Sequence, residues 1–133
     1  MEIYKDPSKT VEERVEDLLS RMTLEEKAAQ LCGDLPMQFM NCHDISGRLR
    51  EKYPDGHGRF TQFSTMGLRD PVELAQMVNR MQHYFVEETR LGIPVAIQSE
   101  NLCGYPGADG TLFPSQVNVG STWDPALVYE MAK

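Results

Sequence analysis

The sequence lacks the features that mark membrane-spanning or nucleic-acid-binding proteins. It contains no apolar run close to the roughly 18 consecutive residues that cross a bilayer, so we expect no membrane partner. It also contains no run of lysine and arginine. Its 13 basic and 20 acidic residues give a net charge of −7, which repels phosphate backbones. Nucleic acid is therefore a poor candidate partner.

Cysteine is scarce, and the first ten residues do not look like an export signal. The chain has 3 cysteines, an odd number, and the segment MEIYKDPSKT has neither a basic start nor an apolar core. These observations favour reduced thiols over a disulfide framework, and we expect a cytoplasmic location. The sequence also has no internal repeat and no low-complexity run.

A helical lead-in is predicted over residues 10–31. Thr10 with Glu13, and Thr23 with Glu26, have the spacing of two capping boxes, each of which opens a helix. The first helix has an apolar stripe at helical spacing: Val11, Val15, Leu18, Leu19 and Met22. Residues 33–59 carry prolines and glycines without a sustained period, so we expect an irregular excursion with one short helical segment at 45–52.

The remainder of the chain alternates between strand and helix signals. Residues 59–66 are rich in aromatic and β-branched side chains and predict a strand. A helix is predicted over 70–91, with Asp70 as N-cap, and its Met77 and Met81 are expected to fill the core.

The segment IPVAIQS, residues 93–99, predicts a strand buried on both faces. Residues 117–122 fit either a strand or a short helix, and Asp124 followed by proline opens a last helix. This order is typical of an α/β protein with room for two or three β/α units. The chain could be a compact small fold, a self-associating half, or the front of something longer.

Glu100 is the residue best placed for chemistry. It stands at the carboxyl end of the strand at 93–99, where ligands meet parallel sheets. A carboxylate there could accept hydrogen bonds from two hydroxyls of a sugar, or it could cap a backbone amide or simply be exposed. Asp109 lies in an Asp-Gly turn and Asp124 reads as a helix cap, so the residues alone identify no acid/base pair.

The cysteines and histidines do not form a convincing reactive group. No spacing brings a histidine to Cys103, which we interpret as an ordinary buried thiol. The adjacent residues Cys42, His43 and Asp44 cannot easily chelate one ion, and residues 56–58 are only part of a phosphate-binding glycine motif. We therefore expect no metal and no cofactor, although a thiol or metal-dependent redox protein is a remaining alternative.

Two blocks of sequence resemble glycoside hydrolase family 3, the group of β-glucosidases and β-xylosidases. They are DPSKTVEERVEDLLSRMTLEEKAAQL at 6–31 and the segment from RLGIPVAIQSENLCG to TWDPALVYEMAK at 90–133. The resemblance implies an incomplete (β/α)8 TIM-type barrel with roughly its first two to three β/α units. Residues 1–133 would then be a truncated N-terminal barrel domain, with a lead-in at 10–31, the excursion at 33–59 and β/α units at 59–133.

The resemblance also implies roles for individual residues. Glu100 matches the acidic position that binds sugar hydroxyls in the −1 subsite, whereas Cys103 stands where the family usually has histidine. The TWDP turn at 122–125 is taken as structural. The family's nucleophilic aspartate, in an SDW-like motif, and its acid/base glutamate have no counterpart in residues 1–133.

The complete protein would be a retaining β-glycosidase acting on terminal β-linked glucose or xylose. We expect the chain alone to be inactive, and to be completed by the rest of the barrel or by a second chain. The alternative is a non-catalytic carbohydrate-binding or assembly subunit that another chain completes.

Overall fold

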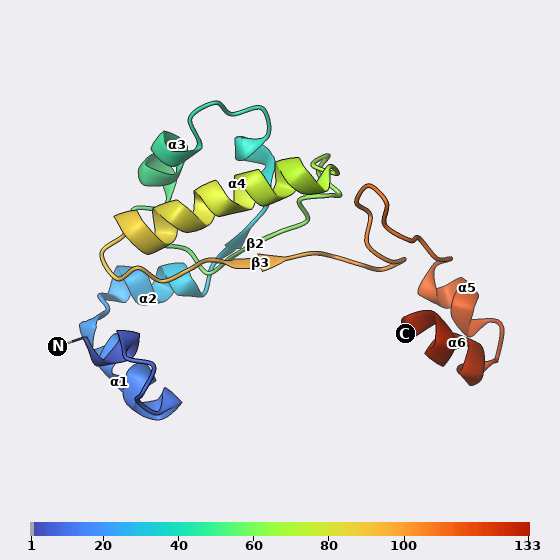
Figure 1. The fold of residues 1–133 in the computed structure, drawn as a ribbon, viewed down its shortest axis with the longest axis horizontal. Helices are drawn as coiled ribbons and strands as arrows, with labels where there is room; N and C mark the ends of the chain where they lie inside the picture. Colours follow the sequence, from blue (N-terminus) through green and yellow to red (C-terminus); the bar gives the residue numbers. More distant parts are fainter. Residues whose placement is uncertain (1) are drawn as a thin grey trace.

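A computed structural model describes residues 2–133 as a small α/β body with a helical pair set apart from it (Figure 1). The strands are β1 (Gly33–Asp34), β2 (Arg59–Thr61) and β3 (Ala96–Gln98). The helices are α1 (Val11–Arg21), α2 (Leu24–Gln30), α3 (Ile45–Lys52), α4 (Pro71–His83), α5 (Gln116–Gly120) and α6 (Pro125–Ala132). Across these described residues, no helix combines the length and apolarity that a bilayer crossing requires.

The three strands form one parallel sheet in the order β1-β2-β3. Gly33 pairs with Arg59, and Arg59 pairs with Ala96, so all three strands share one register. The connection from β1 to β2 contains α3, and the connection from β2 to β3 contains α4. The sequence therefore folds as predicted at the level of class, into mixed helices and a parallel sheet.

The two predicted capping boxes are both present. Thr10 and Thr23 each accept a hydrogen bond from the backbone N–H three residues later, and the carboxylate of that glutamate accepts one from the backbone N–H of the threonine. α1 packs against the 3₁₀ turn Ile3–Lys5, where the Arg14 guanidinium donates to the carbonyl of Tyr4 at 2.9 Å. Its apolar stripe nevertheless stays largely exposed, with Val11 at 67%.

The segment at 33–59 is more regular than expected. It contributes β1, a 3₁₀ turn (Pro36–Phe39) and α3, whose bounds match the predicted short helix. Its apolar side chains Phe39 and Leu49 are fully buried. β1 escaped prediction because two residues are too few to show a period.

Phe60 of β2 is the centre of the core. Its ring lies edge-on to Phe39 at 5.6 Å and to Tyr53 at 5.3 Å, and it contacts Phe85 at 6.3 Å. α3 and α4 cover this face of the sheet, and the predicted core residues Met77 and Met81 are buried there. The remaining members of the cluster are Ile45, Leu49, Phe63, Leu68, Tyr84 and Val95.

The strand at 93–99 was expected to be buried on both faces, and this prediction is wrong. Val95 is buried, but Ala96, Ile97 and Gln98 are exposed, Ile97 at 38%. β3 is an edge strand in the described part of the chain, and only β2 pairs with it. α4 holds the start of this strand, because the Gln82 amide donates to the Val95 carbonyl at 2.7 Å and accepts from its N–H at 3.2 Å.

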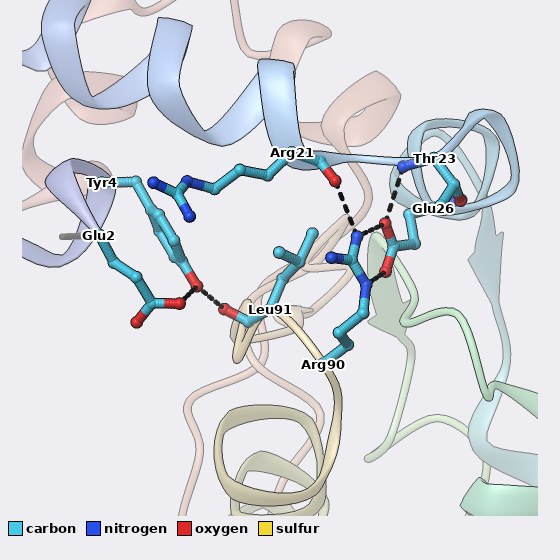
Figure 2. Close-up of polar contacts among 7 residues, drawn as sticks. All are labelled: Glu2, Tyr4, Arg21, Thr23, Glu26, Arg90 and Leu91. Atoms are coloured by element: carbon cyan, nitrogen blue, oxygen red, sulfur yellow. Dashed lines mark hydrogen bonds and ion pairs between the residues drawn. The ribbon is translucent and has the colours of Figure 1, made fainter.

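Glu26 joins the lead-in helices to the segment that enters β3 (Figure 2). Its carboxylate accepts from the backbone N–H of Thr23 at 2.8 Å and from Nε of Arg90 at 2.8 Å, and it forms an ion pair with the same guanidinium. Arg90 also donates to the carbonyl of Arg21 at 2.8 Å. The carbonyl of the next residue, Leu91, accepts from the hydroxyl of Tyr4 at 2.9 Å. The pair of Glu26 and Arg90 therefore connects three segments: α1, α2 and the segment that enters β3.

The substitution Glu26→Gln is expected to lower the free energy of unfolding by about 2 kcal/mol near neutral pH, because a largely buried carboxylate loses its charge-assisted contact with the half-exposed Arg90. The Arg90 guanidinium holds the pKa of the Glu26 carboxyl below its ordinary value, against the opposing effect of burial. This stabilisation is complete above the ordinary pKa of glutamate and is lost as the pH falls through the lower folded-state value. Urea unfolding near pH 7 and near pH 3 measures both effects.

The control for this experiment is Glu25→Gln, which changes an exposed glutamate in the same first turn of α2. The control should change stability by less than about 0.5 kcal/mol. Equal effects of the two substitutions near neutral pH would contradict the role given to Glu26.

Candidate functional site

Polar side chains gather where the three parallel strands end. Asp34 is the last residue of β1, Gln62 follows β2, and Glu100 lies two residues beyond β3. Because the strands are parallel and in register, these residues lie along the same edge of the sheet. This carboxyl edge, Asp34, Gln62 and Glu100, is the candidate site.

Glu100 is exposed, and its partner comes from the neighbouring strand. The side-chain amide of Gln62 donates a hydrogen bond to Oε2 of Glu100. Within residues 2–133 no backbone amide donates to this carboxylate and no cation pairs with it, so it does not act as a helix or turn cap. Its carboxylate is therefore open to solvent on the sheet edge.

Gln62 has an unusual backbone conformation that ends β2. Its φ is +65°, in the left-handed region that side chains other than glycine rarely adopt. Its N–H still donates to the carbonyl of Gln98 in β3 at 3.3 Å, and its own carbonyl accepts from the hydroxyl of Thr65 at 3.1 Å. The strand predicted at 59–66 therefore stops at Thr61, and the Gln62 side chain turns toward β3.

The loop that carries Glu100 is fastened to the loop that follows β2. The buried Ser64 hydroxyl donates to the Tyr105 hydroxyl at 2.8 Å, and the N–H of Ala108 donates to the carbonyl of Arg69 at 2.8 Å. Gly104 has φ +92°, and a Cβ there would lie 2.1 Å from the Thr111 carbonyl oxygen, so only glycine fits. These contacts give the loop a defined course beside the sheet edge.

Asp34 lies on the same edge but is engaged by its own neighbours. The Tyr53 hydroxyl donates to Oδ2 at 2.6 Å and the N–H of Leu35 donates to Oδ1 at 2.8 Å. Partial burial tends to raise the pKa of Asp34, but these hydrogen bonds and one from Gln38 lower it below its ordinary value. Asp34 is thus an ionised carboxylate whose oxygens already have donors.

Of the other residues considered from sequence, two aspartates cap helices and one cysteine is half-buried. Asp124 caps α6 by accepting from the backbone N–H groups of Ala126 and Leu127, as predicted. Asp44 caps α3. Cys103 is half-buried rather than fully buried.

His57 is the one buried histidine of the described chain, and it packs between aromatic rings. Its ring lies 4.5 Å from Tyr53 and 4.6 Å from Phe60, and burial lowers its pKa so that the neutral form is favoured. Searching residues 2–133 for three or more His, Cys, Asp or Glu side chains placed to hold a metal ion finds none.

Comparisons with known proteins agree with the resemblance seen in the sequence. The family model described as "Glycosyl hydrolase family 3 N terminal domain" matches residues 23–133. Over 98% of its length the chain is 35% identical to "Beta-glucosidase C" of Emericella nidulans and 32% identical to "Probable beta-glucosidase C" of Aspergillus oryzae, covering 22% of each protein. It is 31% identical over 94% of its length to a "Putative beta-xylosidase" of Formosa agariphila, covering 17% of it. The chain thus spans about a fifth of the length of these relatives.

The substitution Tyr53→Phe tests the account of Asp34. Removing the hydroxyl should cost about 1–3 kcal/mol near neutral pH, because a half-buried carboxylate loses a donor. Since the folded-state pKa of Asp34 is lowered, its contribution is complete above the ordinary aspartate pKa and disappears as the pH falls through the lower value. The difference between wild type and variant should therefore shrink in urea unfolding as the pH falls below the ordinary aspartate pKa.

Tyr84→Phe is the matched control, because the buried Tyr84 hydroxyl donates to the neutral carbonyl of Tyr53 at 3.1 Å. Its cost should not vary across this acidic range. A cost of Tyr53→Phe that is equally independent of pH would show that the hydroxyl does not hold the ionised form of Asp34.

Proposed function

The chain belongs to glycosyl hydrolase family 3, and from this membership we propose that it forms the start of the N-terminal barrel domain of a retaining β-glycosidase. The proposed substrates of the complete protein are glycosides with terminal β-linked glucose or xylose. The printed names of the relatives, beta-glucosidase and beta-xylosidase, support this substrate class. Because the chain spans about a fifth of those proteins, the activity and substrate belong to the proposal.

The barrel assignment rests on topology. Three parallel strands in chain order, joined by crossovers that contain α3 and α4, are the repeating pattern of a (β/α)8 barrel. β3 has an outer edge to which a further strand could pair, and the loop beyond it leads to α5 and α6, which stand away from the sheet (Figure 1). We assign residues 1–133 to the first two to three β/α units, completed by the remainder of the barrel or by a second chain.

Glu100 is proposed to bind the hydroxyls of the sugar. The observation that carries this role is its position: an exposed carboxylate on the carboxyl edge of a parallel sheet, hydrogen-bonded to Gln62 and, within residues 2–133, paired with no cation. An ionised carboxylate accepts hydrogen bonds only, and its two oxygens suit hydroxyl donors on adjacent carbons. Asp34, whose oxygens are taken by Tyr53 and Leu35, is not available for the same purpose.

Bond cleavage is proposed to depend on residues outside these 133. A retaining enzyme needs a nucleophilic carboxylate and an acid/base carboxyl group about 5–5.5 Å apart across the glycosidic bond. The sequence contains no SDW motif. The proposed contribution of this chain is thus one wall of the sugar pocket.

A second candidate function is a non-catalytic carbohydrate-binding or assembly subunit. Large exposed apolar side chains favour it: Val117 is 83% exposed, Trp123 91% and Val11 67%. Apolar groups exposed to this extent on α1, on α5 and in the turn before α6 suit contact with another chain. Sedimentation of the isolated chain separates the candidates, because a monodisperse monomer argues against an assembly subunit.

The isolated chain is expected to release no nitrophenol from p-nitrophenyl β-glucoside or β-xyloside above the rate in buffer. The physical reason is that one binding carboxylate cannot supply both the nucleophile and the proton donor. Absorbance of nitrophenolate measures the reaction, and a full-length β-glucosidase serves as positive control. Steady release that survives addition of a chelator would contradict the proposal.

Glu100→Gln is expected to weaken binding of methyl β-glucoside to the chain by about tenfold, which corresponds to one charge-assisted hydrogen bond. Backbone amide shifts in an NMR titration measure the affinity and also report whether the fold is intact. Asp109→Asn is the matched control, since Asp109 is an exposed acid on the same loop. Equal affinity of wild type and Glu100→Gln would contradict the assignment.

A further inference from the structure

Glu100 lies on a loop, whereas its partner Gln62 is bonded directly to the sheet. Gln62 donates its N–H to Gln98 of β3 and accepts from Thr65, so its backbone is held on both sides. Glu100 follows β3 by two residues and its side chain is exposed. An exposed glutamate by itself samples many rotamers, and ordering it on ligand binding costs conformational entropy.

The backbone of Gln62 is held in a conformation that its residue type does not favour. Among side chains other than glycine, asparagine and aspartate adopt positive φ most readily, yet a glutamine occupies this position with φ +65°. Strained residues of this kind gather at functional sites, where the strained backbone aims a side chain. As a consequence, the Gln62 amide at the end of β2 reaches the carboxylate of Glu100 on the loop that follows β3.

We propose that Gln62 is a positioning residue for sugar binding, which fixes the Glu100 carboxylate on the carboxyl edge of the sheet. This inference rests on the proposed role of Glu100. Because an ionised carboxylate cannot donate, the contact must use the N–H of the Gln62 amide, and the amide carbonyl is left facing away from Glu100 as an acceptor. The contact uses Oε2 of Glu100 and leaves Oε1 without a protein donor among the described residues.

This arrangement selects a class of ligand. The acceptor sites that Glu100 has left suit hydroxyl groups on adjacent carbons, as in an unsubstituted pyranose. A sugar lacking one of those hydroxyls would leave an acceptor without a partner and should bind more weakly. Gln62 acts on this recognition through Glu100, by preorganising its carboxylate.

The test is a double-mutant cycle on the 133-residue chain, with methyl β-glucoside as the probe and NMR titration as the measurement. Gln62→Met keeps the length of the side chain but removes its amide, and should weaken binding about fivefold. The double variant with Glu100→Gln should bind no more weakly than Glu100→Gln alone, because Gln62 acts through Glu100. Gln76→Met, on the exposed face of α4, is the matched control and should leave the affinity unchanged.

Two further variants separate the side chain from the backbone. Gln62→Asn relieves the unfavourable φ but is one carbon too short to reach Glu100, so it should bind as weakly as Gln62→Met. Gln62→Glu places two carboxyl groups together and should bind still more weakly near neutral pH. Its affinity should partly recover on acidification, because one proton shared by the two carboxyl groups restores a donor. A purely structural role for Gln62 would not produce this pH dependence.

The outcomes distinguish this inference from the proposed function. If wild type binds the sugar and Glu100→Gln does not, while Gln62→Met and Gln62→Asn bind like wild type, the positioning role is overturned and the role of Glu100 stands. If the wild-type chain does not bind the sugar, both the proposed function and this inference are overturned. If Gln62→Met does not fold, Gln62→Asn gives the same decision.

Discussion

The ion pair between Glu26 and Arg90 is the constraint on which the arrangement of the chain depends. The Glu26 carboxylate completes the cap of α2, and the guanidinium it holds also binds the last carbonyl of α1, at Arg21. Arg90 immediately precedes the segment that enters β3, so one contact fixes where the lead-in helices meet the sheet. A buried carboxylate without its cation would be costly, which makes this junction sensitive to substitution on either side.

The ion pair of Glu26 and Arg90 lies before the start of β3, and the candidate site lies at the carboxyl ends of the three strands. The hydrophobic core lies between these two regions. Phe60, surrounded by Phe39, Tyr53 and Phe85, packs α3 and α4 onto one face of the sheet. Packing at the amino-terminal side and ligand contacts at the carboxyl edge are the usual division in parallel α/β proteins. This division explains why the backbone strain at Gln62 is tolerated: the surrounding sheet and loop contacts hold it in place.

Local signals in the sequence were sufficient for the helices but not for the details of the sheet. Both predicted capping boxes, and the Asp-Pro pairs at 70–71 and 124–125, opened helices where predicted, because these signals act within four residues. The exposure of Ile97 depends on which strands flank β3, and a short window of sequence does not contain this information. Glu100 could be nominated because it follows a strand signal. Gln62 could not, since a glutamine with positive φ has no sequence signature.

The carboxylates of Asp34 and Glu100 lie on one edge of the sheet but differ in their hydrogen-bond partners. Tyr53 and Leu35 occupy the oxygens of Asp34, so its charge is used inside the protein to hold β1 against the segment that follows α3. Glu100 receives a donor from Gln62 and faces solvent with the rest of its acceptor capacity. A pair poised for glycoside cleavage would need one carboxyl group kept protonated near a second, ionised one. The lowered pKa of Asp34 favours its ionised form, so Asp34 is not suited to the protonated role.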